Sequence, residues 1–137
     1  MAANDFIYAS TPLASDMAVK NTDSVDFAAG DVIKADATNV VSATQRHIGA
    51  LRATTDDYPL GVAMEAIPQG KTGRVRPIGI AQVVATAAIT AGVAVQADTT
   101  GRVKAQAAAK PQLGQALTAA GGAGDKLLVA ISIAKNA

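Results

Sequence analysis

The chain contains an internal repeat, and this repeat limits the folds that it can adopt. Residues 91–105, AGVAVQADTTGRVKA, align without gaps with residues 29–43, AGDVIKADATNVVSA, and seven of the fifteen positions are identical. A second pair follows, because residues 60–81 and 113–134 both begin with Leu-Gly and end with Ile-x-Ile-Ala. Two copies are too few for a solenoid or a propeller. The repeat therefore predicts two similar units that close on one core.

The pattern inside each unit predicts β structure. Short runs rich in Val and Ile are separated by turns rich in Gly, Asp and Asn, which is typical of strands joined by tight connections. Pro77 indicates that its strand lies at an edge of the sheet or begins late. A short helix is an alternative prediction for residues 85–91, because alanine favours helices. We expect strands at residues 17–21, 32–35, 47–52, 60–66, 75–85, 93–95, 113–119 and 127–134, with Leu127, Val129, Ile131 and Ile133 on one face of the last.

These patterns predict an all-β fold, a small barrel or sandwich built from two similar units, with an extended N-terminal arm. A chain of 137 residues fits one domain. We expect residues 1–27 to form the arm and a first short strand, and residues 28–137 to form a single β domain with halves at about 28–85 and 90–134. The core should be thin, because 32 residues are alanine and only four are aromatic. We therefore expect partner surfaces to supply part of the stability.

Two equivalent turns are expected to have a structural role. Asp36 and Asn39 delimit the first turn, and Asp98 and Gly101 delimit the second at the aligned positions. Asn and Gly are the residues that adopt the left-handed backbone region most readily. A hairpin that ends on a left-handed residue accounts for both turns.

The composition argues against several classes of function. The chain has no cysteine, so it has neither a disulfide framework nor a thiolate site, which fits assembly in a reducing cytoplasm. The net charge of +1 gives no sign of a nucleic-acid partner. The N-terminal stretch lacks the basic and apolar regions of a signal peptide, and no apolar run is long enough for a membrane span.

No motif indicates an enzyme, a cofactor or a metal site. Gly70-Lys71-Thr72 lacks the glycine of a phosphate-binding loop, since Glu65 stands in its place. The Asp98–Gly101 turn differs by one residue from the Asp-Thr-Gly of aspartic proteases. His47 is the single histidine, so a histidine-based metal cluster is excluded. A small hydrolase that uses His47 is a rival reading, and replacing His47 would test it.

Three groups of residues are candidates for contacts with a partner protein or with another subunit. The charge is uneven along the chain, at −4 over residues 1–31 and +5 over residues 32–137, which would suit a docking surface as well as ordinary solubility. The N-terminal arm could equally be a frayed terminus, and the basic residues before Pro77 could be a solvated hairpin. The candidates are Phe6, Ile7 and Tyr8 in the arm, Arg46 and Arg52 in an apparent insertion at residues 44–58, and Lys71, Arg74 and Arg76.

The sequence resembles the short head decoration, or cement, proteins of tailed bacteriophages. The resemblance covers about residues 28–134 and lies in Ala-Gly-x-x-Val-x-Ala-Asp-x-x-Gly-x-Val at residues 91–103, Leu-Gly-x-Ala-Leu-x-Ala-Ala at 113–120, and a Gly-Asp turn with a terminal strand after it. It implies a β-rich domain, usually a homotrimer, which docks on the outside of an icosahedral capsid and holds major capsid subunits together. It implies no cofactor and no catalysis.

The expected function is therefore that of a structural virion protein. Its partners would be the major capsid protein and further copies of itself, without nucleic acid or membrane, and it would be made in the host bacterial cytoplasm. The alternative is a receptor- or glycan-binding surface module of a virion. Such a module would need exposed aromatic side chains for stacking on sugars, and the chain has two Phe, two Tyr and no Trp.

Overall fold

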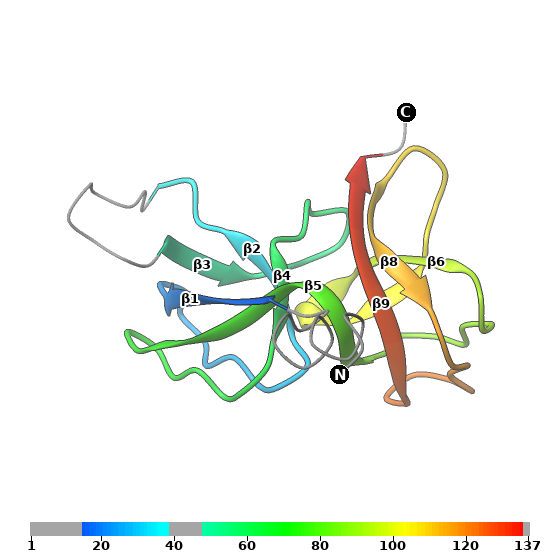
Figure 1. Cartoon of the computed structure of the whole chain (residues 1–137), viewed down its shortest axis with the longest axis horizontal. Coiled ribbons are helices and arrows are strands. Elements are labelled where there is room, and N and C mark those ends of the chain that lie inside the picture. The colour runs from blue at the N-terminus through cyan, green and yellow to red at the C-terminus, as the bar shows by residue number, and fades with distance from the viewer. Residues whose placement is uncertain (1–14, 39–47, 136–137) are drawn as a thin grey trace, which may run out of the picture.

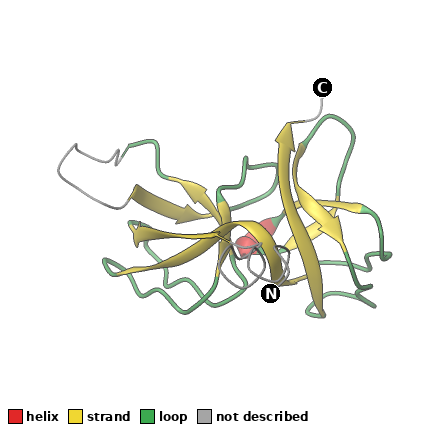
Figure 2. Ribbon diagram, viewed as in Figure 1, coloured by secondary structure: helices red, strands yellow, loops and turns green. Residues whose placement is uncertain are grey.

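The computed structural model describes residues 15–38 and 48–135, and nearly all of its regular structure is β (Figure 2). The short 3-10 turn η1 is the helical element of this part of the chain. The strands are β1 (Ser15–Asn21), β2 (Val32–Ala35), β3 (Ile48–Arg52), β4 (Gly61–Ala63), β5 (Thr72–Val84), β6 (Ala94–Ala97), β7 (Val103–Ala105), β8 (Pro111–Ala116) and β9 (Lys126–Lys135), with η1 (Thr99–Gly101) between β6 and β7.

The first unit is a closed barrel of five strands. The strands follow one another in the order β1-β3-β2-β4-β5, and an additional antiparallel pairing between β1 and β5 closes the ring. The pairing of β1 with β3 is parallel, and the other pairings are antiparallel. Closure leaves no open sheet edge around the ring.

One long strand, β5, belongs to both units, and Figure 1 shows it arching between them. Its first part pairs with β1 and β4, and its second part, Gly79–Val84, pairs with β9. The prediction of an edge or late-starting strand at Pro77 is wrong, because β5 begins at Thr72 and lies inside the sheet. The register between β1 and β5 shifts at this point, so that positions 76 and 77 lie opposite residue 16. A bulge of this kind accommodates a residue that has no N–H to donate.

The second unit repeats the pairings of the first, which confirms the expectation of an all-β fold made of two similar units. The second half of β5 plays the part of β1: Val83 lies opposite Leu127 as Val19 lies opposite Gly73. The parallel contact of β1 with β3 at Asn21 and Ala50 returns as a parallel bridge between Ala85 and Val103. The order β5-β9-β8-β6-β7 therefore corresponds to β1-β5-β4-β2-β3.

Each buried residue of the first hydrophobic cluster has a counterpart in the second. Seven buried residues form the core of the first barrel: Val19, Phe27, Ile33, Ala50, Ala63, Ile67 and Val75. Their counterparts in the second cluster are Val83, Ile89, Val95, Val103, Ala116, Ala120 and Val129. Val32, Ala53 and Val62 of the first unit also belong to this second cluster. The first unit thus completes the core of the second, and the two pack as one body.

Two interpretations of the sequence differ from the structure. Residues 85–91 are not helical, because Ala85 and Ile89 form separate bridges to Val103 and Ala120. The apparent insertion at residues 44–58 contains the strand expected at residues 47–52, which is β3, but Ala50 of this strand is the counterpart of Val103 in β7. The additional chain therefore lies before β3.

The Ile-x-Ile-Ala echo is out of register by one residue. The turn at residues 121–125 is one residue longer than its counterpart at residues 68–71, so Val129 matches Val75 and Ser132 matches Ile78. A shift of one residue moves a side chain to the other face of a strand. Ile131 is therefore buried, as are Leu127 and Val129 on its face, whereas Ile78 and Ile80 are exposed.

Candidate functional site

The basic cluster predicted at β5 is part of an ion-pair network. Arg76 holds Asp16 of β1 by two hydrogen bonds, from Nε to Oδ1 at 2.8 Å and from Nη2 to Oδ2 at 3.4 Å. Arg74 Nε lies 2.9 Å from Glu65 Oε2, and its Nη1 lies 3.5 Å from Asp16 Oδ2. The hydrogen bond from Arg74 holds the pKa of Glu65 below its usual value. Two arginines and two carboxylates balance one another, so this surface is not a free basic patch.

Lys71 is the member of the cluster that stays outside the network. It lies in the turn before β5, is exposed, and takes part in no ion pair among the described residues. Its backbone is fixed, because its N–H donates to the carbonyl of Pro68 and its carbonyl accepts from Asn21. Lys71 is thus an exposed side chain on a turn whose backbone is held by two hydrogen bonds.

Arg52 lies at the junction of the two units. Its N–H donates to Asp23 Oδ2 at 2.8 Å, and its Cγ would lie 2.8 Å from a Cβ added to Gly101. Burial raises the pKa of Asp31 nearby, and a backbone hydrogen bond and the charges of Arg52 and Arg102 reduce this effect. The side chain of Arg52 therefore supports the packing of η1 on the first unit.

The predicted turn residues form a repeated hydrogen-bond arrangement. Thr22 Oγ1 donates to Asp36 Oδ2 at 2.6 Å, and Thr86 Oγ1 donates to Asp98 Oδ2 at 2.6 Å. Gly101 adopts a φ of +71°, as expected for a left-handed residue at the turn. Asn39 lies outside the described residues, as do Phe6, Ile7, Tyr8 and Arg46.

A face of exposed apolar side chains was missed by the sequence analysis. Ile78 and Ile80 of β5, Leu128 of β9 and Leu117 after β8 expose between 40% and 61% of their surface. Tyr58 is the other exposed large apolar residue in the described part of the chain. The signal was present in the alternation of β5, where the exposed Ile78, Ile80 and Gln82 alternate with the buried Ala81 and Val83.

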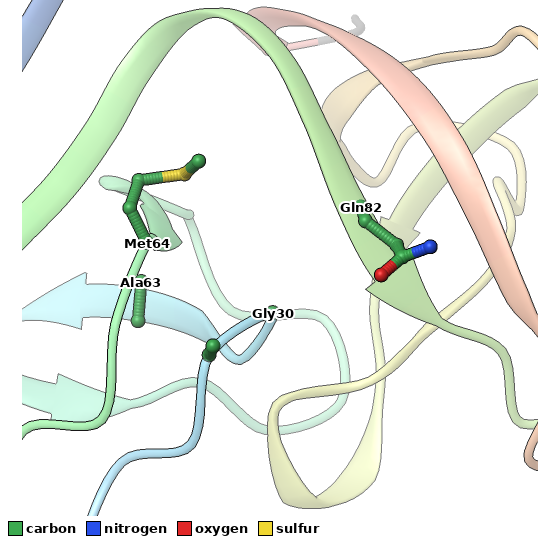
Figure 3. A pocket seen from close by; sticks show the side chains of 5 residues that line it. Gly30, Ala63, Met64 and Gln82 are labelled. Atoms are coloured by element: carbon green, nitrogen blue, oxygen red, sulfur yellow. The ribbon is translucent and has the colours of Figure 1, made fainter.

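Two hollows of the surface offer contact area with few ionisable groups. Figure 3 shows one of about 210 Å³, where Met64 and Gln82 stand on either side of the Gly30 turn. It lies between the first unit and the second half of β5. Another, of about 470 Å³, is lined by Lys34, Ala35, Tyr58, Pro59 and Leu60. No titratable side chain lines the first hollow, and one lysine lines the second.

The described residues contain no group of three or more His, Asp or Glu side chains that could hold a metal ion. Within the same ranges, no helix has the length and apolar character needed to cross a membrane.

We expect the free energy of unfolding to fall when the pH drops below about 4, the ordinary pKa of Asp. Burial raises the pKa of Asp98, but hydrogen bonds from Thr86 and Thr55 outweigh it, so the pKa is lowered. A lowered folded-state pKa gives stability that is present above the unfolded value and lost as the pH falls through the folded one. Asp98→Asn should therefore cost stability at pH 7 and cost progressively less below pH 4, as measured by urea unfolding across pH.

Asp31 provides the control for this pH dependence. Its pKa is raised, chiefly by burial, so its ionisation disfavours the folded state as the pH rises. The free energy of unfolding of Asp31→Asn should therefore rise relative to that of the native chain as the pH rises. This trend is opposite to the one expected for Asp98→Asn. A difference between Asp98→Asn and the native chain that stays constant from pH 7 to pH 2 would contradict the assignment.

Comparison with known proteins relates this architecture to a solved structure and to a protein family. No protein with a curated description matches the chain in sequence. Among solved structures, the chain is similar to the N base of the head fiber protein gp8.5 of bacteriophage phi29, with a TM-score of 0.66 and 18% identity, covering 90% of this chain and 98% of that one. At this identity the likeness shows a shared fold. The family model described as phage cement protein matches residues 19–131, which cover most of both β units, and the chain therefore belongs to the phage cement protein family.

Proposed function

We propose that this protein binds the outer surface of an icosahedral phage head and bridges neighbouring major capsid subunits. Membership of the phage cement protein family implies a capsid-associated structural role. The bridging step is supported by the architecture, because the barrel and the second unit share β5 and one hydrophobic cluster. A body of this kind can touch two subunits without bending between them. The observation that carries the proposal is the family match over both units.

The proposal includes a homotrimer and excludes catalysis. Closed cyclic symmetry suits a protein that sits on the symmetry axes of a capsid. The protein would act by binding alone, on the exterior of the virion, after synthesis in the host bacterial cytoplasm. Its proposed partners are the major capsid protein and its own copies, with no nucleic acid, membrane or cofactor.

Among the proposed contact residues, Lys71 is the one that is most available to a partner. This side chain is exposed and lies outside the ion-pair network. Arg74 keeps 60% of its side chain accessible while it binds Glu65, so it can still donate to a partner. Arg76 is more enclosed, and Arg52 is held at the junction of the units. Phe6, Ile7, Tyr8 and Arg46 stay predictions.

Co-sedimentation with capsids that lack the protein is the experiment that tests the function. We expect saturable binding, and a higher temperature of capsid disassembly once the sites are filled, because each bridge raises the free energy needed to separate two subunits. A receptor- or glycan-binding module would attach without changing that temperature. Filled capsids that disassemble at the temperature of bare capsids would therefore contradict bridging.

Lys71→Glu should weaken capsid binding by about fivefold, near 1 kcal/mol, the upper end for an exposed ion pair. The expected cause is repulsion from an acidic patch on the capsid, and the effect should shrink as salt is added. The matched control is Lys126→Glu, since Lys126 is also exposed and directly follows the corresponding turn of the second unit. Equal effects of the two variants on the binding isotherm would remove Lys71 from the contact surface.

A further inference from the structure

The outer face of the second unit carries uncharged and mostly apolar side chains where the first unit is charged. Its rows run across three strands, with Gln82 opposite Leu128 and Ile80 opposite Ala130. The N–H of Leu117 donates to the carbonyl of Leu128 at 2.7 Å, which extends the first row to β8. We name Ile78, Ile80, Leu117, Leu128 and Ala130 the apolar face. Four of the five exposed large apolar residues in the described ranges lie on it.

The repeat provides an internal comparison for this face. The matching registers place Asp16, Arg74 and Arg76 of the first unit at the positions of Ile80, Leu128 and Ala130 of the second. In the first unit these positions form the ion-pair network described above. The fold therefore does not require apolar side chains here. A clustered apolar surface that the fold does not require indicates a covering partner.

We propose that residues 1–14 of the same chain cover the apolar face, with Phe6, Ile7 and Tyr8 as the side chains that pack on it. The first described residue, Ser15, lies opposite Ile78 in the β1–β5 pairing. The preceding segment therefore starts at the border of the face. It carries three consecutive large apolar side chains, including two of the four aromatic residues of the chain.

The length of the segment fits the distance. From Ser15 back to Tyr8 the chain can span about 23 Å when extended, whereas the first and third strands of a sheet lie about 10 Å apart. Because the segment is tethered beside the face, its local concentration is in the millimolar range. This favours the chain's own segment over a second copy. These three side chains would then contact their own chain in place of the capsid, which can be tested without capsids.

The chain lacks cysteine, so a pair of introduced cysteines gives an unambiguous test. Ala9→Cys places a thiol next to Tyr8 and leaves the three apolar side chains intact. Ser132→Cys places its partner on an exposed position of β9, beside the apolar face. The control partner is Ala66→Cys, exposed near the charged face of the first unit. We expect oxidation at low protein concentration to link residues 9 and 132 within one chain, at least tenfold more than residues 9 and 66.

Two further variants separate docking from chance contact. Ile80→Asp and Leu128→Asp each put a charge on the apolar face and should lower the 9–132 link at least tenfold, while circular dichroism shows the β content retained. Since the chain has no tryptophan, Phe6→Trp adds a second readout, and its emission should move to longer wavelength when Ile80→Asp is added. Equal linking of 9–132 and 9–66 would overturn the proposal. So would links found only between chains, because they would assign the face to a neighbouring copy.

Discussion

Gly114→Ala is expected to lower the free energy of unfolding by about 3 kcal/mol, the upper end for overpacking in a protein core. A Cβ at this position would lie 2.0 Å from the carbonyl oxygen of Ala130 and 3.0 Å from the Cα of Ile131. Both atoms belong to the backbone of β9, so no side-chain rotation can relieve the contact. The two strands would have to separate at the pairing of Gly114 with Ile131.

The first unit contains the same close approach of two strands at a glycine. Gly61 begins β4, and its added Cβ would lie 2.4 Å from the carbonyl oxygen of Arg76. Gly61→Ala should therefore be costly as well. The shared Leu-Gly of the repeat marks these two places, where a short strand crosses close to the backbone of its long neighbour.

Gly122→Ala is the control for this prediction, because a Cβ there would meet no atom within 4 Å. Denaturant unfolding of the three variants beside the native chain gives the comparison, with the midpoint and slope fitted separately. Midpoints for Gly114→Ala and Gly122→Ala that agree would show that β8 and β9 can separate at little cost.

Gly101→Val is expected to destabilise the protein by about 3 kcal/mol, since backbone strain alone is worth 1–3 kcal/mol. Two causes combine. Gly101 has a φ of +71°, which a β-branched residue adopts with difficulty. An added Cβ would also lie 2.8 Å from Cγ of Arg52 and 3.1 Å from Cβ of Asp31. Gly101→Asn tolerates the φ value better and should cost less, although its Cβ meets Arg52 too.

A double-mutant cycle separates the two causes. Combining Gly101→Ala with Arg52→Ala removes the contact with the Arg52 side chain and leaves the contact with Asp31 and the backbone strain, so the pair should cost less than the sum of the single changes. Gly124→Ala reports backbone strain alone, because Gly124 has a φ of +87° and no atom lies within 4 Å of its added Cβ. Strict additivity at Gly101 and Arg52, or equal midpoints for Gly101→Val and Gly101→Asn, would contradict this account.

A destabilising substitution at Gly101 should lower the stability of both units. The N–H of Gly101 donates to the carbonyl of Ala53 at 2.9 Å, so η1 of the second unit is fixed to the end of β3 in the first. Ala53 itself belongs to the hydrophobic cluster of the second unit. We therefore expect one cooperative unfolding transition, with the two units melting together.

The sequence was sufficient for those features that depend on local pattern. The repeat predicted two similar units, and the alternation of Leu127, Val129 and Ile131 placed the buried face of β9 correctly. The left-handed turn at Gly101 followed from the preference of glycine for that region. These features are encoded within a few residues of one another, where backbone preference and strand periodicity act directly.

Features that depend on register or distant partners were decided by the tertiary structure alone. One additional residue in the turn at 121–125 moved Ile131 to the inner face and left its apparent equivalent, Ile78, exposed. The basic cluster at Arg74 and Arg76 is neutralised by Asp16, which comes from a strand far away in the sequence. Sequence alone determined that this chain is a duplicated β fold without a catalytic motif, because composition and periodicity are local properties. Only the folded chain decided which faces are balanced by charge and which remain apolar, because strand pairing sets which side chains meet.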